Sequence, residues 1–131
     1  MKRLNVLLLA CLLLIKLTGC SSNSPETVAK EFTIAFYKGD IKKAKSYCTE
    51  QTQKGVDFLV SMMGSEDFKE NLPTNIKVKA TQCKLAEDGE SAIVYLDISG
   101  NYPGKGERTE QNKLPLVKKD GKWKVVINFK N

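Results

Sequence analysis

The sequence predicts an α+β domain in which N-terminal helices pack on a curved, four-stranded antiparallel sheet. Apolar residues recur at helical spacing up to about residue 63, whereas from residue 76 onward they alternate with polar residues. The first pattern is typical of amphipathic helices and the second of strands with one buried face. Because all the helical segments precede all the strand segments, the order favours α+β over an alternating α/β fold.

The helical half contains clear start and stop signals. Ser24 is a favourable N-cap and Pro25 suits the first helical position, so a helix is expected from Pro25 to about Gly39. Further helical segments are expected after Asp40, over residues 50–63 with a cap at Thr49 or Thr52, and for one turn at 66–71.

Four strands are expected over about residues 76–85, 92–98, 108–118 and 123–129, with a loop at 100–106. The alternating apolar residues occupy even-numbered positions up to Ala80 and odd-numbered positions from Cys83 onward. This change of parity predicts a β-bulge near residues 81–82 and a curved sheet. Pro115 indicates an edge position or a bulge, because proline has no N–H to donate. Asp120-Gly121 is a strong two-residue hairpin signal.

The amino terminus has the features of an export signal. Lys2 and Arg3 precede ten apolar residues at 6–15, a run that is short for a membrane span. Leu17-Thr18-Gly19-Cys20 then resembles the lipobox of bacterial lipoproteins. The resemblance implies cleavage before Cys20, diacylglycerol on its thiol, and a further acyl chain such as palmitate on the new amino terminus. An ordinary cleaved signal, or a transmembrane anchor with an incidental cysteine, is the alternative.

The predicted organisation is therefore a signal peptide at 1–19, a lipidated cysteine with a tether at 20–24, and one domain at 25–131. The protein would lie in the cell envelope, held by Cys20 on the outer side of the cytoplasmic membrane or on the outer membrane. Without the leader, 18 basic and 15 acidic residues remain, a net charge of +3. These charges are interspersed, so a nucleic-acid partner is not expected.

Two cysteines remain in the predicted domain. Cys48 and Cys83 form an even pair in an exported chain, where disulfides persist, and a bridge between them would close a loop of about 36 residues. The alternative is two buried thiols that act as small apolar side chains.

No catalytic or metal-binding constellation is evident. The sequence has no histidine, which excludes Ser-His-Asp and Cys-His systems and removes the commonest metal ligand. No cofactor, metal ion or catalytic residue is predicted.

The helical segments with Gly39-Asp40, the helix ending at residues 47–49 (YCT), and the terminal KKDGKWKVV at 118–126 carry a family resemblance. They resemble small uncharacterised bacterial lipoprotein domains of the nuclear transport factor 2-like superfamily. The resemblance implies a cone, formed by a curved sheet around helices and often open at one end.

A non-catalytic module that binds a small apolar ligand or an envelope protein is the leading functional hypothesis. Its candidate pocket residues, for which ordinary core packing is the alternative, are Phe32, Phe36, Phe58, Met62, Tyr95, Asp97 and Trp123. The alternative is a small enzyme resembling the isomerases or dehydratases of the superfamily, with Asp97 and Tyr95 as its base and hydroxyl donor. The exposed sheet face could also form a homodimer.

Overall fold

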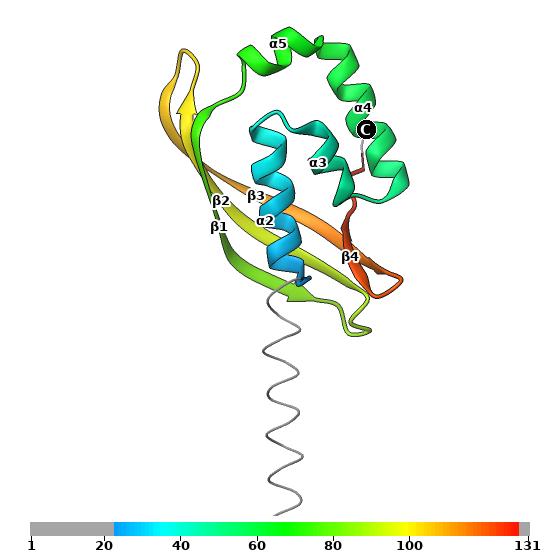
Figure 1. Cartoon of the computed structure of the whole chain (residues 1–131). Coiled ribbons are helices and arrows are strands. Elements are labelled where there is room, and N and C mark those ends of the chain that lie inside the picture. Colours follow the sequence, from blue (N-terminus) through cyan, green and yellow to red (C-terminus); the bar gives the residue numbers. More distant parts are fainter. Residues whose placement is uncertain (1–22, 129–131) are drawn as a thin grey trace, which may run out of the picture.

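In a computed structural model of the chain, which describes residues 23–128, a four-stranded antiparallel sheet curves around helix α2 (Figure 1). The helices are α2 (Pro25–Tyr37), α3 (Ile41–Ser46), α4 (Glu50–Met63) and α5 (Ser65–Glu70). The strands are β1 (Thr74–Leu85), β2 (Ser91–Tyr102), β3 (Gly106–Lys119) and β4 (Lys122–Val125), in the order β1-β2-β3-β4. The predicted α+β class is confirmed.

The helices begin where capping side chains are available. The Ser24 hydroxyl accepts the Thr27 N–H at 3.1 Å, the Asp40 carboxylate accepts the Lys43 N–H, and Thr49 caps α4. Each cap satisfies one backbone donor that has no partner within the helix. Of the two threonines proposed to start the third helix, Thr49 is the cap.

The sheet register confirms the predicted bulge. β1 pairs with β2, and the register shifts between Ala80 and Gln82. The shift moves the inward-facing position from Ala80 to Cys83, as the change in apolar parity requires. Asp120 and Gly121 both have positive φ, as a two-residue hairpin turn of this type requires.

Several strand boundaries differ from prediction. Residues 100–102 continue β2, and β3 begins at Gly106, so the predicted loop shortens to a turn. β4 ends at Val125 instead of continuing to residue 129. The Pro115 carbonyl accepts the Val126 N–H at 2.9 Å, but Pro115 has no N–H to return, and the β3–β4 ladder stops there.

The core lies between α2 and the concave face of the sheet. The even-numbered residues of β2 from Ala92 to Gly100 point inward and are buried, including Val94, Leu96 and Ile98. They pack against Val28 and Phe32 of α2 in one hydrophobic cluster. The odd-numbered residues of β2 face the opposite, convex side, so the sheet has one buried and one solvated face.

Candidate functional site

A small cavity lies between α2, α4 and the concave face of the sheet. Its volume is about 140 Å³. The lining is mostly apolar and consists of Phe32, Thr33, Phe36, Tyr37, Val56, Leu59, Leu96, Asn112, Leu114 and Ile127. A dry cavity of about this size can hold a molecule as large as benzene. The fold therefore leaves room for a small apolar group inside the cone.

Aromatic rings form one wall of this cavity. Phe32 and Phe36 stack along α2 with their ring centroids 6.0 Å apart. Phe68 of α5 meets Phe36 edge-on at 5.4 Å and is itself buried, so α5 closes over this end of the aromatic wall. Edge-on and offset ring contacts are favourable, and they hold the wall in a fixed shape.

Few polar groups line the cavity. The buried Thr33 hydroxyl donates to the Ala29 carbonyl at 2.8 Å, so its donor is already used within α2. Asn112, on the concave side of β3 opposite Leu96, is exposed and brings an amide to the lining. A bound molecule would thus meet an apolar wall and one amide able to donate and accept.

Tyr37, Tyr102 and Glu110 lie together on the concave side next to this cavity. Burial raises the pKa of Tyr37, and the nearby Glu110 carboxylate raises it further, against an opposing effect of the Tyr102 hydroxyl. Burial is also the main cause that raises the pKa of Tyr102. Both hydroxyls therefore stay protonated at neutral pH. The Tyr102 oxygen is buried and has no well-formed hydrogen bond within residues 23–128.

The predicted pocket residues divide into four groups, of which Tyr95 and Asp97 form the last. Phe32 and Phe36 line the cavity, and Trp123 is buried in the core without lining it. Phe58 and Met62 are 64% and 70% exposed on the outer side of α4. Their assignment to the pocket is corrected, because the other face of α4, with Val56 and Leu59, points into the cone.

Tyr95 and Asp97 share one face of β2, but it is the convex face and not the interior of the cone. Their neighbours Leu96 and Ile98 face inward, and strand geometry sends alternate side chains to opposite sides. The prediction that these two residues line the cone is corrected. Both instead line a surface hollow of about 600 Å³ on the outside of the sheet.

Cys48 and Cys83 are free thiols. Cys48 lies beside Val125 at the β4 edge, whereas Cys83 is in β1 at the other edge. Neighbouring strands are about 4.8 Å apart, so the edges are separated by roughly 14 Å, while a disulfide needs Cα atoms within about 7 Å. The predicted bridge is therefore corrected. Cys20, the predicted lipidation site, lies outside the described residues.

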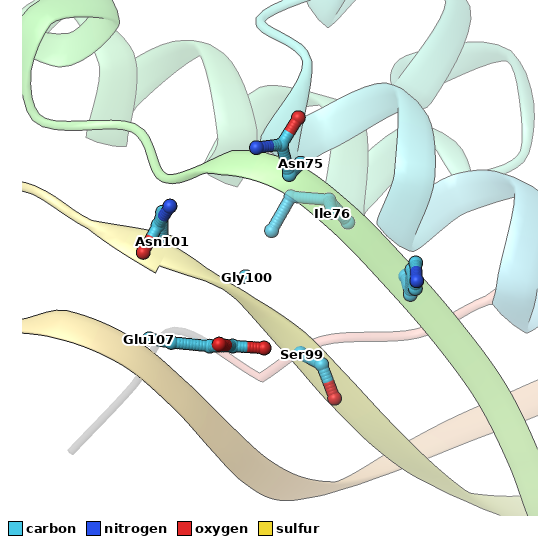
Figure 2. Close-up of a pocket in the computed structure, with 7 residues that line it drawn as sticks. Asn75, Ile76, Ser99, Gly100, Asn101 and Glu107 are labelled. Carbon is cyan, nitrogen blue, oxygen red and sulfur yellow. The ribbon is translucent and has the colours of Figure 1, made fainter.

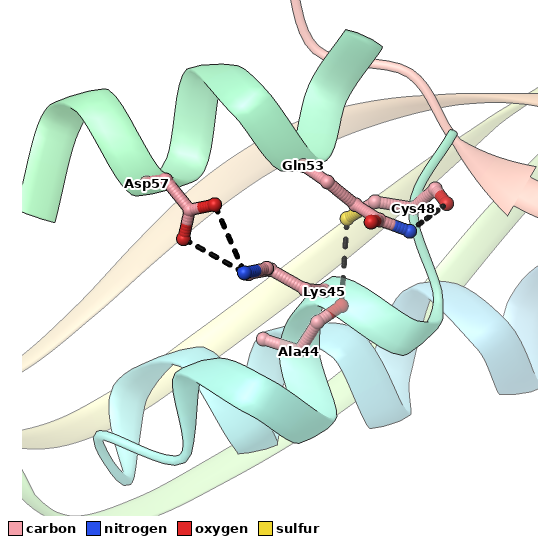
Figure 3. Close-up of polar contacts among 5 residues, drawn as sticks. All are labelled: Ala44, Lys45, Cys48, Gln53 and Asp57. Carbon is pink, nitrogen blue, oxygen red and sulfur yellow. Dashed lines mark hydrogen bonds and ion pairs between the residues drawn. The ribbon is translucent and has the colours of Figure 1, made fainter. Parts of the chain in front are cut away.

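Cys48 instead belongs to a polar junction between α3 and α4 (Figure 3). Its thiol donates to the Ala44 carbonyl at 3.4 Å, and its own carbonyl accepts from the Gln53 amide at 3.2 Å. Lys45 and Asp57 form an ion pair at 2.9 Å between the same helices. Burial raises the pKa of Cys48 to about 12, so this thiol is structural in character.

A further hollow, of about 480 Å³, lies where β1, β2 and β3 meet near Gly100 (Figure 2). Asn75 and Ile76 come from β1, Ser99 and Asn101 from β2, and Glu107 from β3. A Cβ atom at position 100 would lie 2.7 Å from the Ile76 Cδ1 atom, so a larger residue there would require the Ile76 side chain to move.

Sequence reasoning missed the polar residues near the cone, namely Tyr37, Tyr102, Glu110 and Asn112. The signal was present for two of them. Leu114 and Leu116 are buried apolar residues at even-numbered positions of β3, and the same alternation places Asn112 and Glu110 on that face. Tyr102 was missed because it falls in the segment that was predicted to be a loop.

No cluster of three or more potential metal ligands occurs within residues 23–128. Over the same residues, none of the helices has the length and apolar character needed to span a membrane.

Comparison with solved structures identifies the architecture. A Campylobacter jejuni protein described as an NTF2-like (nuclear transport factor 2-like) transpeptidase aligns with a TM-score of 0.52 and 22% identity over 80% of this chain and 99% of its own. The fold is NTF2-like.

Other solved structures share this fold. A protein from Thiobacillus denitrificans, described as a calcium/calmodulin-dependent protein kinase II association domain, aligns with a TM-score of 0.55 and 12% identity over 79% of this chain and 90% of its own. A SEC-C motif-containing protein from Rhodopseudomonas palustris gives 0.54 and 13%, over 78% and 74%. No family model and no curated protein sequence matches the chain.

Proposed function

We propose that this protein is a non-catalytic binding module, tethered to a membrane by lipid on Cys20, whose NTF2-like cone holds a small apolar ligand. The observation that carries the binding role is the cavity of about 140 Å³ against the aromatic wall of Phe32 and Phe36. Apolar cavities with a few convergent polar groups are the usual sites for small ligands.

The size and lining limit the ligand class. The cavity is smaller than the 300–1,000 Å³ typical of drug-sized sites, so it fits one ring or a short branched chain. Asn112 favours a ligand with one hydroxyl or carbonyl at its end. A small alcohol, phenol or ketone meets both conditions.

The arrangement of reactive groups favours binding over catalysis. Asp97 and Tyr95, the residues of the enzyme alternative, lie on the convex face and cannot act on a molecule inside the cone. The transpeptidase role in the name of the Campylobacter jejuni protein would require an activated serine or cysteine. Here the Cys48 pKa is raised to about 12, which opposes formation of the reactive thiolate.

The lipobox supports the lipid anchor, and the position of Asn23 indicates which end of the domain the anchor would hold. Asn23 is fixed to the domain, because its side chain accepts the Trp123 N–H at 2.8 Å. Only Ser21 and Ser22 separate Asn23 from Cys20, a reach of roughly 10 Å at full extension. A lipid on Cys20 would therefore hold the end of the domain that carries Asn23 close to the membrane.

Cavity binding is tested with a series of small alcohols and phenols, measured by calorimetry on the full chain in neutral detergent. A Leu59→Trp substitution should fill the cavity and abolish binding, whereas Val60→Trp, one position along α4 and outside the lining, should leave it intact. Binding that survives Leu59→Trp, or no binding by the parent protein, would contradict the proposal.

The anchor is tested independently. Mass spectrometry of the protein from its host membrane should show a chain that starts at Cys20 and carries acyl groups. Cys20→Ser should release the protein into the soluble fraction. An unmodified Cys20, or membrane partitioning that Cys20→Ser does not change, would argue against the anchor without affecting the cavity.

A further inference from the structure

The convex face of the sheet carries a second candidate site, separate from the cone. The hollow of about 600 Å³ on this face lies at the β-bulge of β1 and spans β1, β2 and β3. The outward side chains around it include Gln82, Tyr95, Asp97, Gln111 and Lys113. Both amides and the ammonium group can donate hydrogen bonds, and the amides and the carboxylate can accept them.

Among the described residues, the carboxylate of Asp97 lacks a hydrogen-bond donor for one of its oxygens. One carboxylate oxygen, Oδ1, is buried, and no group within residues 23–128 donates a hydrogen bond to it. Its cross-strand neighbours are Lys79 and Gln111, yet neither forms an ion pair or hydrogen bond with it. A buried acceptor without a donor is destabilising, and a ligand that donates to the carboxylate would offset this cost.

Lysines surround the hollow. Lys113 pairs with Tyr95 across the sheet, and the Lys84 ammonium lies 5.3 Å from the centroid of the Tyr95 ring. Lys77 and Lys79 of β1 are exposed on the same face, opposite Ser99 and Asp97. The surface therefore attracts negative charge, while the hollow within it presents a carboxylate that needs a hydroxyl or amide donor.

These two features together select one class of ligand. A simple polyanion would satisfy the lysines but would be repelled by Asp97 and could not donate to it. A neutral glycan would donate hydroxyls but leave the lysines unused. A second copy of this face would bring two sets of lysines together, which is unfavourable. We propose that the hollow around Asp97 binds an acidic polysaccharide, with a sugar hydroxyl donating to Asp97 and sugar carboxylates near the lysines.

The test compares three fluorescent probes on the full chain in neutral detergent, by fluorescence anisotropy at low salt. They are a hyaluronan hexasaccharide, which alternates uronate and N-acetylglucosamine, chitohexaose, which is neutral, and a short polyphosphate. Hyaluronan should bind at least about tenfold more tightly than either of the others, because only it supplies both the hydroxyl and the carboxylate. Raising the salt concentration should weaken this binding.

Asp97→Asn should reduce hyaluronan binding about tenfold or more, since the amide removes the charged acceptor. Gln111→Ala tests the same hollow without altering Asp97, should Asp97→Asn fail to fold. Lys54→Ala, which removes one exposed lysine from α4, is the matched control and should bind as the parent does.

Several results would overturn the proposal. They are no hyaluronan binding, equal binding of polyphosphate or chitohexaose, and loss of binding in Lys54→Ala as large as in Asp97→Asn. Concentration-dependent dimerisation in sedimentation experiments that Asp97→Asn disrupts would instead assign this face to a second copy of the chain.

Discussion

The backbone N–H of Trp123 donates a hydrogen bond of 2.8 Å to the side-chain oxygen of Asn23, joining the two ends of the described chain. The contact fastens the residue before the α2 cap to the start of β4, which is an edge strand. The edge N–H groups of a sheet need partners, and here one is supplied by a residue that sequence reasoning assigned to a tether.

Asn23→Ala should destabilise the domain by about 1–2 kcal/mol, because it leaves the partly buried Trp123 N–H without an acceptor. Urea unfolding followed by Trp123 fluorescence measures the change. Asn101→Ala, at an exposed position, is the control and should change the unfolding free energy by less than about 0.5 kcal/mol. Equal effects of the two substitutions would show that the Asn23 contact adds no stability.

The two free thiols predict a loss of stability at alkaline pH. Burial raises the pKa of Cys48 to about 12, with Lys124 opposing, and burial together with Glu26 raises the pKa of Cys83 to about 11. Below the ordinary value of 9.0 both thiols are protonated whether the chain is folded or unfolded, so their contribution is constant. As the pH rises from about 9 toward 12, the unfolded chain loses these protons first and stability falls.

Urea unfolding from pH 7.5 to 10.5 tests this expectation. The informative comparison is with the Cys48→Ala, Cys83→Ala double variant, whose stability should fall less steeply. Iodoacetamide should also modify both thiols slowly in the native protein at pH 8 and rapidly in guanidinium. If Cys48 and Cys83 resist modification in guanidinium without reductant, they are disulfide-bonded and the expectation fails.

The elements that local signals determine could be predicted from the sequence. Ser24, Asp40 and Thr49 are caps that act within one turn, and Asp120-Gly121 is a turn that few other residues can form. The β-bulge was also predictable, because parity is a property of neighbouring residues. Each of these features depends on contacts close in sequence.

What could not be predicted depends on the assembled sheet. The distance between Cys48 and Cys83 follows from their places at opposite edges, which no spacing in the sequence encodes. Tyr95 and Asp97 alternate with buried apolar residues of β2 and therefore share one face, but assigning that face to the outside requires knowing which side the helices cover. Phe58 was misplaced because α4 has apolar residues on more than one side.

The Ile127–Thr52 hydrogen bond is partly buried and the Lys45–Asp57 ion pair is exposed. Their contributions to the free energy of unfolding can therefore be compared. The Thr52 hydroxyl accepts the Ile127 N–H at 3.1 Å and is buried, whereas the Lys45–Asp57 ion pair is largely solvated. Thr52→Val should therefore cost about 1–3 kcal/mol, and Asp57→Asn less than about 0.5 kcal/mol. Chemical unfolding of both variants measures the two effects. A larger effect for Asp57→Asn would contradict the expectation that the partly buried hydrogen bond contributes more stability than the exposed ion pair.

Gly100 tests how closely β1 and β2 pack at the end of the sheet. An added Cβ atom would lie 2.7 Å from the Ile76 Cδ1 atom and 3.1 Å from the Thr74 carbonyl oxygen, both too close for normal contact. Gly100→Ala should therefore destabilise the domain by about 1–3 kcal/mol, the usual cost of overpacking.

The Ile76→Val substitution removes Cδ1, so in the Gly100→Ala background it should recover part of this loss, although alone it should be destabilising. Urea unfolding of the parent, both single variants and the double variant completes a thermodynamic cycle. Strictly additive effects would mean that the Ile76 side chain does not cause the strain, leaving the Thr74 carbonyl contact as its source.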